Sequence, residues 1–290
     1  MTDTTQPTQQ TTDQAKTSVE LEEKSQFAYA VLKHAASLTV VRIDRDAFLR
    51  AQLAKHLPHI DVEQAIAMTP ARAGATLDEL DTIADAIINF EVKKCSGISF
   101  LAGIPGGFAA LGTIPADLAQ YFGHVLRIEQ QLAYIYGWQS FIDADQEIDD
   151  ETLFELILLM GVMLKVGGAA SAVSALANVA QQEVTKRIAN KALTKTTYYP
   201  VIKRVLRMIG IKVTKESFAK NAGKFVPLLG GVLSGGMTWL SFKPAAHHLK
   251  KYLRSLPQAR GLDAPVKDQD FLEDFIEAEV VSDEDMQSAE

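Results

Sequence analysis

Apolar residues recur every three or four positions along most of the chain, which is the spacing expected for one buried face of an α-helix. The clearest case follows the capping-box pattern from Thr76 to Glu79, in which the two side chains can each bond a free amide of the first helical turn. The apolar positions that then keep helical spacing are Leu80, Ile83, Ala84, Ile87, Ile88 and Val92. We therefore expect a helix that begins at this box and continues to Cys95 with one face buried.

Other helices are predicted from the residues at their ends. Asp44 can accept a hydrogen bond from the first turn of one helix, which Pro58 would end. Pro115 suits the first turn of another, and Gly137 suits its C-terminal cap. The ranges expected to be helical on these grounds and from their apolar spacing are 45–57, 115–136, 149–164 and 169–193.

The fold class predicted from this pattern is all-α. The segment from Leu38 to Ile43 is rich in β-branched residues and could form a strand, but no second strand is available to pair with it. No other run shows a convincing alternation of apolar and polar residues. We expect a multi-helix bundle that includes glycine-rich apolar helical hairpins.

The chain divides into three parts by composition. Residues 1–18 are rich in Thr and Gln and contain too few apolar side chains to offset the entropy lost on ordering, so we expect disorder there. Residues 19–256 form the expected helical domain, and residues 257–290 an acidic, mobile tail. The apolar residues of this tail that recur at helical spacing, and allow a short amphipathic helix, are Phe271, Leu272, Phe275, Ile276 and Val280.

Three stretches are unusually apolar and rich in glycine. The range 95–116 has no charged residue over 22 positions, 225–242 has none over 18, and 156–182 is interrupted only by Lys165. A membrane-spanning helix needs about 20 apolar residues, but glycine and Pro105 would break a regular helix in the first stretch. The glycines that favour close approach of two backbones are Gly103, Gly106, Gly107, Gly230, Gly231 and Gly235. Two interpretations remain open: contact with a membrane, or tight helix packing in a protein core.

Composition narrows the class of protein. The chain has 290 residues, 47% of them apolar, and one cysteine, which excludes an internal disulfide framework and a multi-cysteine zinc site. The polar start of the chain has no secretory signal, so we expect a cytoplasmic protein. The mean hydropathy of +0.03 lies between typical soluble and integral membrane proteins.

Charge is unevenly distributed. The range 268–290 has ten acidic residues and no Lys or Arg, which leaves a net charge of +3 on the rest of the chain. The range 186–224 has eleven basic residues and one acidic residue, Glu216, and could bind anionic lipid or the acidic tail, or could be an ordinary solvated helix face. Nucleic acid is a less suitable partner, because no base-stacking or groove-reading motif accompanies these charges. The candidate anion contacts in this range are Lys186, Arg187, Lys203, Arg204 and Arg207.

A second group of polar residues lies within the helix expected at 115–136. Asp117, Gln120, His124, Arg127 and Gln131 are three or four residues apart and so share one face of that helix. The face could contact a lipid headgroup or small anion, chiefly through Asp117, His124 and Arg127, or it could be the solvent side of an amphipathic helix. Glu129 lies off this face and could pair with an arginine of another helix.

Motifs of known chemistry are missing from the sequence. There is no nucleophile elbow, phosphate-binding loop, dinucleotide fingerprint or recognised spacing of metal ligands, so we assign no catalytic, cofactor or metal residues. The adjacent pair His247 and His248 points in different directions on a helix and suits a surface or interface better than a metal site. Cys95 is expected to be a buried structural thiol.

The residues from Gly103 to Trp138 resemble the central signature of the EcsC family. That signature is a glycine- and proline-rich turn, then Ile-Pro-Ala-Asp-Leu, an arginine-bearing helix and a closing Ala-Tyr-x-Tyr-Gly. Downstream, the range 191–195 and the Pro-x-x-Gly-Gly segment and last helix within 224–253 match in the same order, so the resemblance spans about residues 27–253. A membrane domain appended to some bacterial GTPases is similar to a smaller part, but this chain has no phosphate-binding loop.

The resemblance implies a bacterial, cytoplasm-facing, membrane-associated helical protein, and it provides no catalytic residues. The family is named for a protein encoded beside an ABC transporter, so a transporter is one candidate partner. Our hypothesis is a non-enzymatic protein at the inner face of the cell membrane that binds anionic lipid or a membrane protein. The alternatives are a soluble cytoplasmic adaptor whose glycine-rich segments pack in the core and, less favoured, an enzyme acting on lipid.

Overall fold

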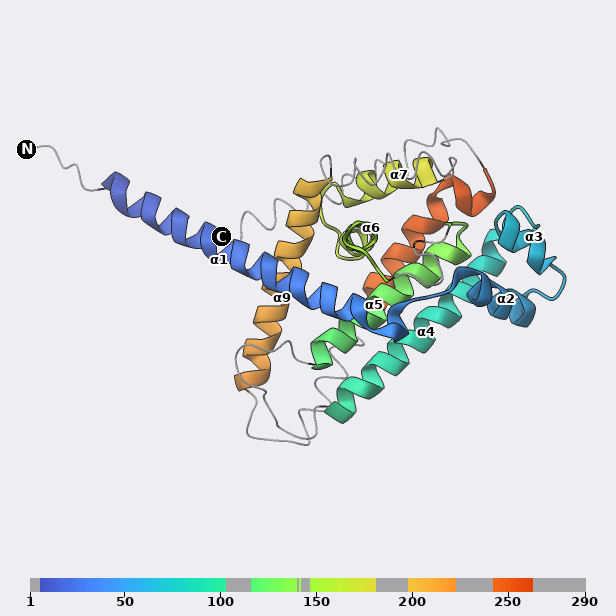
Figure 1. The fold of residues 1–290 in the computed structure, drawn as a ribbon, viewed down its shortest axis with the longest axis horizontal. Coiled ribbons are helices and arrows are strands. Elements are labelled where there is room, and N and C mark those ends of the chain that lie inside the picture. Colours follow the sequence, from blue (N-terminus) through green and yellow to red (C-terminus); the bar gives the residue numbers. More distant parts are fainter. Residues whose placement is uncertain are drawn as a thin grey trace, which may run out of the picture.

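The computed structural model describes residues 6–102, 116–139, 141, 147–180, 198–222 and 242–262, with side chains described over 16–96, 118–139, 141, 147–177, 198–213 and 242–262. This part of the chain is helical and contains no strand, which confirms the all-α fold class (Figure 1). Its helices are α1 (Gln6–Ser37), α2 (Arg45–His56), α3 (Val62–Ala67), α4 (Leu77–Ala102), α5 (Ala116–Ile135), α6 (Asp150–Met163), α7 (Ala169–Ala180), α9 (Tyr199–Ala222) and a last helix at 242–255. The glycine-rich hairpin positions Gly103, Gly106, Gly107, Gly230, Gly231 and Gly235 lie outside the described residues.

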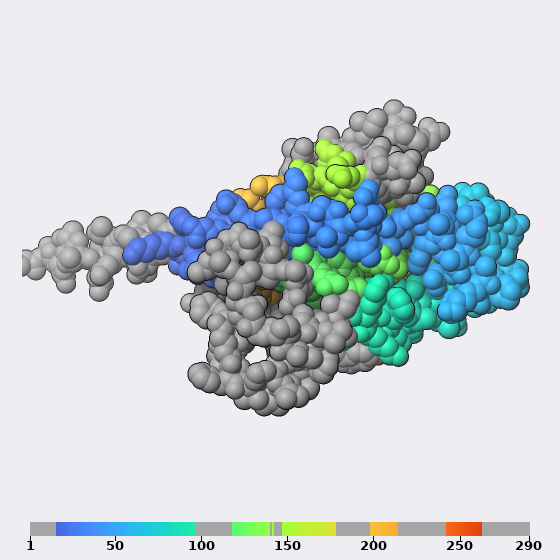
Figure 2. Space-filling model, turned by 60° about the horizontal axis from the view of Figure 1, so that its bottom comes forward, coloured from blue at the N-terminus to red at the C-terminus, as the bar shows by residue number. Residues whose placement is uncertain are grey.

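The start of the chain differs from its expectation. The structure begins α1 at Gln6, within the segment that we expected to be disordered through residue 18. Adding a turn to an existing helix costs much less than nucleating one, so the packed second half of α1 can extend its polar first half. That second half lies along the surface of the body, with Ala28, Val31, Leu32 and Ala35 buried (Figure 2).

The predicted helix caps are confirmed. The Asp44 carboxylate accepts a 2.8 Å hydrogen bond from the amide of Ala47 at the start of α2. At the start of α4, Glu79 accepts from the Thr76 amide at 2.9 Å, and the Thr76 hydroxyl accepts from the Glu79 amide at 3.4 Å. These bonds satisfy amides that have no partner within the helix itself.

The connection between α1 and α2 corrects one expectation. The possible strand at 38–43 is a short 3₁₀ turn, η1 (Thr39–Val41), flanked by extended residues. Val41 points into the core, and its carbonyl accepts a hydrogen bond from the Gln130 amide group on α5. Docking against α5 therefore takes the place of strand pairing.

The end of α5 shows why its glycine is needed. Gly137 has φ of +90°, and the amides of Gly137 and Trp138 bond back to the carbonyls of Tyr134 and Ala133. This is the Schellman arrangement, in which the left-handed position favours glycine. A methyl group at position 137 would also lie 2.8 Å from the Gln258 carbonyl oxygen, so the backbone at Gln258 packs closely against this glycine.

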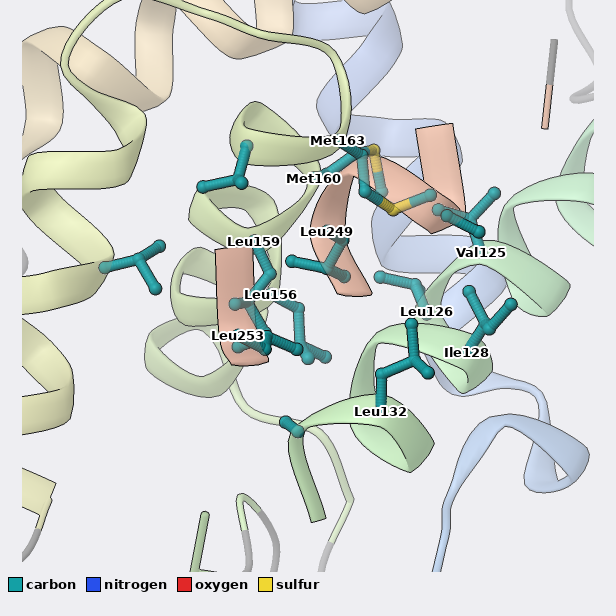
Figure 3. Close-up of a cluster of buried hydrophobic side chains, with 14 of the residues drawn as sticks. Val125, Leu126, Ile128, Leu132, Leu156, Leu159, Met160, Met163, Leu249 and Leu253 are labelled. Atoms are coloured by element: carbon teal, nitrogen blue, oxygen red, sulfur yellow. The ribbon is translucent and has the colours of Figure 1, made fainter. Parts of the chain in front are cut away.

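Helix α6 lies at the centre of the bundle. Its residues Leu156, Leu159, Met160 and Met163 face α5 and the 242–255 helix, and all are nearly inaccessible to solvent (Figure 3). The described part of the uncharged stretch 156–182 is therefore mostly core, which agrees with the packing interpretation for this stretch.

Close helix crossings depend on glycines that the sequence pattern did not single out. A methyl group on Gly210 of α9 would collide with the carbonyl oxygen of Lys24 on α1. One on Gly161 of α6 would lie 2.7 Å from a methyl carbon of Val205 on α9. Both positions need hydrogen as the side chain because the neighbouring helix passes too close for a Cβ atom.

The first residues of the range expected to be a mobile tail are packed against the body. Residues 257–260 form a 3₁₀ turn, η2 (Pro257–Arg260), in which Gln258 and Ala259 are buried. The Arg72 guanidinium donates to the Gly261 carbonyl at 3.2 Å, so the turn docks on the connection between α3 and α4. Residues 263–290, with the expected short amphipathic helix, lie outside the described residues.

Candidate functional site

A buried ionic cluster links α4 to α5. The Glu91 carboxylate on α4 lies 2.7 Å from Nδ1 of His124 and 3.2 Å from Nε of Arg127, both on α5. Arg127 also donates through Nη1 to the carbonyl of Val40 in η1. The Glu91 side chain is fully buried, His124 is 6% exposed and Arg127 is 17% exposed.

The two basic partners decide the charge state of Glu91. Burial acts to raise the pKa of this carboxyl, but the His124 hydrogen bond and the Arg127 charge outweigh burial, and the pKa is lowered overall. Glu91 is therefore an anion at neutral pH. A carboxylate only accepts hydrogen bonds, so Nδ1 of His124 carries the proton in this contact.

This cluster changes the interpretation of the polar face predicted on α5. His124 and Gln131 are buried, so the view of this face as the solvent side of an amphipathic helix is wrong. Arg127 and His124 are brought together, but by Glu91, an anion from within the chain. The side chain of Asp117 lies outside the described residues, and contact of this face with an external anion stays a prediction. Sequence reasoning missed Glu91 because it belongs to another helix.

Glu129 does not form the ion pair with an arginine of another helix that the sequence analysis suggested. Its side chain is fully buried, and neither carboxyl oxygen has a hydrogen-bond partner among the described residues. The residues one turn away on α5, Val125, Leu126, Leu132 and Ala133, are also buried. Burial raises the pKa of Glu129 well above its usual value, because the charged form loses its hydration. Burial of this unbonded carboxyl therefore favours its protonated, neutral form.

The basic side chains of the range 186–224 differ in their surroundings. Lys186 and Arg187 lie outside the described residues. Lys203 on α9 pairs with Glu22 of α1 at 3.3 Å and lies over the ring of Tyr199. The guanidinium of Arg204 lies beside Gly168. Arg207, another of the predicted contacts, is exposed to solvent.

A ladder of charges that the sequence analysis did not identify joins α4 to the last helix. Asp81 accepts from Tyr136 at 2.6 Å and from Arg254 at 2.7 Å, and Asp85 pairs with Lys250 at 2.7 Å. The sequence did contain a signal for this ladder: Asp81 and Asp85 are four residues apart on one helix, as are Lys250 and Arg254 on the other. The order of these pairs shows how the helices run. Later residues of α4 pair with earlier residues of α5 and of the last helix, so α4 is antiparallel to both.

The ends of four helices therefore meet at one end of the bundle. Because α4 and α5 are antiparallel, Ala102 at the end of α4 and Ala116 at the start of α5 lie at the same end. Phe242, at the start of the last helix, contacts Tyr121 near the start of α5, with ring centroids 5.9 Å apart. Figure 1 shows that α9 also ends on this side of the body. These four ends are the points where the uncharged ranges 95–116 and 225–242 leave and rejoin the described bundle.

Within the described ranges, no helix is long and apolar enough to cross a membrane. In the same ranges, no cluster of His, Cys, Asp and Glu side chains is arranged to hold a metal ion. Cys95 is buried, as expected. Comparison with known proteins found no matching family model, curated protein or solved structure.

Proposed function

We propose that this chain is a membrane-associated helical protein of the EcsC type, which acts by binding rather than by catalysis. Its partner would be an anionic lipid surface or a membrane protein such as a transporter, at the cytoplasmic face of the membrane. The observation that carries the proposal is the common end of the bundle where the uncharged ranges 95–116 and 225–242 start and finish.

Two apolar segments that leave a protein at one end can meet a bilayer together. The first has 22 uncharged residues and the second 18, and glycine and proline in them favour short hairpins over one straight helix. The basic residues Lys212, Lys215 and Lys220 lie in the half of α9 that leads to this end. Basic residues beside an apolar segment strengthen binding to anionic lipid.

The soluble-adaptor alternative is favoured by a different observation. The stretch 156–182 has only one charged residue, Lys165, and its described part packs mostly in the core within α6 and α7. The segments at 95–116 and 225–242 would then pack against protein in the same way. The enzyme alternative gains no support, because His124 and Arg127 are already bonded to Glu91.

Fractionation of cells that express the full chain separates these functions. We expect the protein in the membrane pellet, released by high salt if basic residues hold it, or resistant to alkaline carbonate if the apolar segments are inserted. Pelleting with purified vesicles of phosphatidylcholine and phosphatidylglycerol tests lipid binding without other proteins. A protein that stays in the supernatant in both experiments would contradict the proposal and favour the adaptor.

A further inference from the structure

We infer that the exposed face of α4 formed by Phe90, Lys93 and Lys94 is the surface of the helical body that contacts anionic lipid. The inference rests on the proposed function and names the contact that would place the body on the membrane. It does not depend on the structure of the uncharged segments.

Phe90 is a large apolar side chain that is exposed to solvent, which is unusual for phenylalanine. Its exposed fraction is 62%, the highest among the large apolar residues of the described chain. Lys93 and Lys94 follow three and four residues later, so the three side chains share one side of α4, and both lysines are exposed. An aromatic ring beside basic side chains is the composition of helices that lie at a lipid–water interface.

The charge of this face is positive because the nearby carboxylate is turned away. Glu91 follows Phe90 in sequence, but its side chain is buried against His124 and Arg127. Neither Lys93 nor Lys94 has an ion pair with any residue whose side chain is described. The other acidic residues of α4 lie nearer its start, where Asp81 and Asp85 pair with the last helix.

A second exposed apolar residue lies two contacts away from Glu91, and an uncharged segment follows this face in sequence. Val40 of η1 is 54% exposed, and its carbonyl accepts from the same Arg127 that holds Glu91. One residue after Lys94, the uncharged range 95–116 begins, and α4 continues into it as far as Ala102. The exposed face therefore leads toward the end of the bundle where both apolar segments start and finish.

These features fit an anionic lipid surface better than they fit water. Phe90 would enter the headgroup region, and the two lysines would approach the phosphates while their aliphatic stems cover apolar surface. A positive surface also excludes a partner of like charge. A complementary acidic protein is the competing occupant, and the experiment below distinguishes it.

The test uses the full chain and measures co-sedimentation with vesicles of phosphatidylcholine alone or mixed seven to three with phosphatidylglycerol. We expect the double variant Lys93→Gln/Lys94→Gln to bind the anionic vesicles about thirtyfold more weakly than the wild type. Phe90→Ser is expected to weaken binding at every salt concentration. The matched control Lys16→Gln/Lys55→Gln removes the same charge from exposed sites on α1 and α2 and should bind like the wild type.

A second measurement reports the position of the face directly. In Phe90→Trp, the added tryptophan should shift its emission to shorter wavelength with anionic vesicles, after subtraction of the wild-type signal, while Val19→Trp on exposed α1 should not. All substituted side chains are exposed, so thermal unfolding should be unchanged.

The outcomes separate the two proposals. Wild-type protein that binds neither kind of vesicle overturns this inference, and it overturns the proposed function as well only if the protein is also absent from the membrane pellet of cells. Wild-type binding that the changes at 90, 93 and 94 leave intact, with no emission shift at position 90, overturns the inference alone. Equal binding to neutral and anionic vesicles overturns the part assigned to the lysines.

Discussion

Nδ1 of His124 on α5 donates a 2.7 Å hydrogen bond to the carboxylate of Glu91 on α4, and both side chains are buried. Arg127, one turn further along α5, binds the other carboxylate oxygen at 3.2 Å. The cluster is a polar clamp between two helices whose facing surfaces are otherwise mainly apolar. The positive charge of Arg127 and the hydrogen bond from His124 together stabilise the ionised carboxylate of Glu91 away from water.

Removal of Glu91 should be strongly destabilising. Glu91→Leu leaves Arg127 and His124 without their acceptor, and breaking such a buried pair costs about 3–5 kcal/mol. Urea unfolding followed by circular dichroism measures the loss. Glu20→Gln, which removes an exposed pair with Lys24, is the control and should change stability by less than about 1 kcal/mol. Similar effects of the two changes would show that the cluster carries no special stability.

The buried acid Glu129 makes stability fall as pH rises. Its pKa is raised in the folded protein, so between the unfolded and folded pKa values the folded state binds the proton more tightly. The contribution is complete below the unfolded value, near 4.3, and is lost by about 1.4 kcal/mol per pH unit up to the folded value. Glu129→Gln keeps a neutral polar side chain and should remove this slope.

The measurement for Glu129 is the free energy of unfolding by urea at several pH values from 5 to 9. The difference between wild type and Glu129→Gln should shift in favour of the variant as pH rises. Glu63→Gln, at a carboxyl that is exposed on α3 and paired with Arg50, provides a comparison whose pKa is lowered rather than raised. A difference between wild type and Glu129→Gln that does not change with pH would mean that Glu129 is ionised in the fold.

A single methyl group at position 210 should disturb the crossing of α1 and α9. Gly to Ala within a helix normally stabilises it by about 0.5–1 kcal/mol. Here the new Cβ would meet the backbone of Lys24, which cannot move without displacing α1, so Gly210→Ala should instead destabilise by about 1–3 kcal/mol. Thermal unfolding decides the sign, with exposed Arg207→Ala on the same helix as control. A higher melting temperature for Gly210→Ala would contradict the crossing.

Two aspartates one turn apart should differ in importance. Asp81 is 23% exposed and bonds Tyr136 and Arg254, whereas Asp78 is 93% exposed and meets Arg254 at 3.3 Å. Asp81→Asn should destabilise by about 1–3 kcal/mol, and Asp78→Asn by less than about 0.5 kcal/mol. Burial and the hydrogen bond to Asp81 both raise the pKa of Tyr136, so ultraviolet titration of the folded protein should show this tyrosine protonated beyond the usual range. Equal losses for the two aspartate variants would argue against the ladder as an anchor.

Local signals accounted for α2, α4, α5, α6 and the start of α7, but not for α1, α3 or α9. The caps at Asp44, Thr76 and Gly137 involve side chains and backbone within a few residues, and each occurs where it was predicted. The segment from Leu38 to Ile43 was misleading, because β-branched residues favour extended backbone whether or not a neighbouring strand exists. Pro257–Arg260 was missed for a related reason: its burial depends on Arg72 and Gly137, which are distant in sequence.

In the candidate site, local spacing predicted some features, and contacts between distant segments decided the others. The spacing of His124 and Arg127 correctly put them on one face of α5, but spacing within one helix contains no information on what covers that face. The spacing pattern therefore could not predict the roles of Glu91 and Gly210 or the partners of Asp81. The sequence by itself determined the helical class, the caps at Asp44, Thr76 and Gly137, and the uncharged stretches, because these follow from residue types and contacts between near neighbours. Only the tertiary structure decided which polar groups are buried together and which ends of the helices meet, because desolvation and close packing act between segments far apart in the chain.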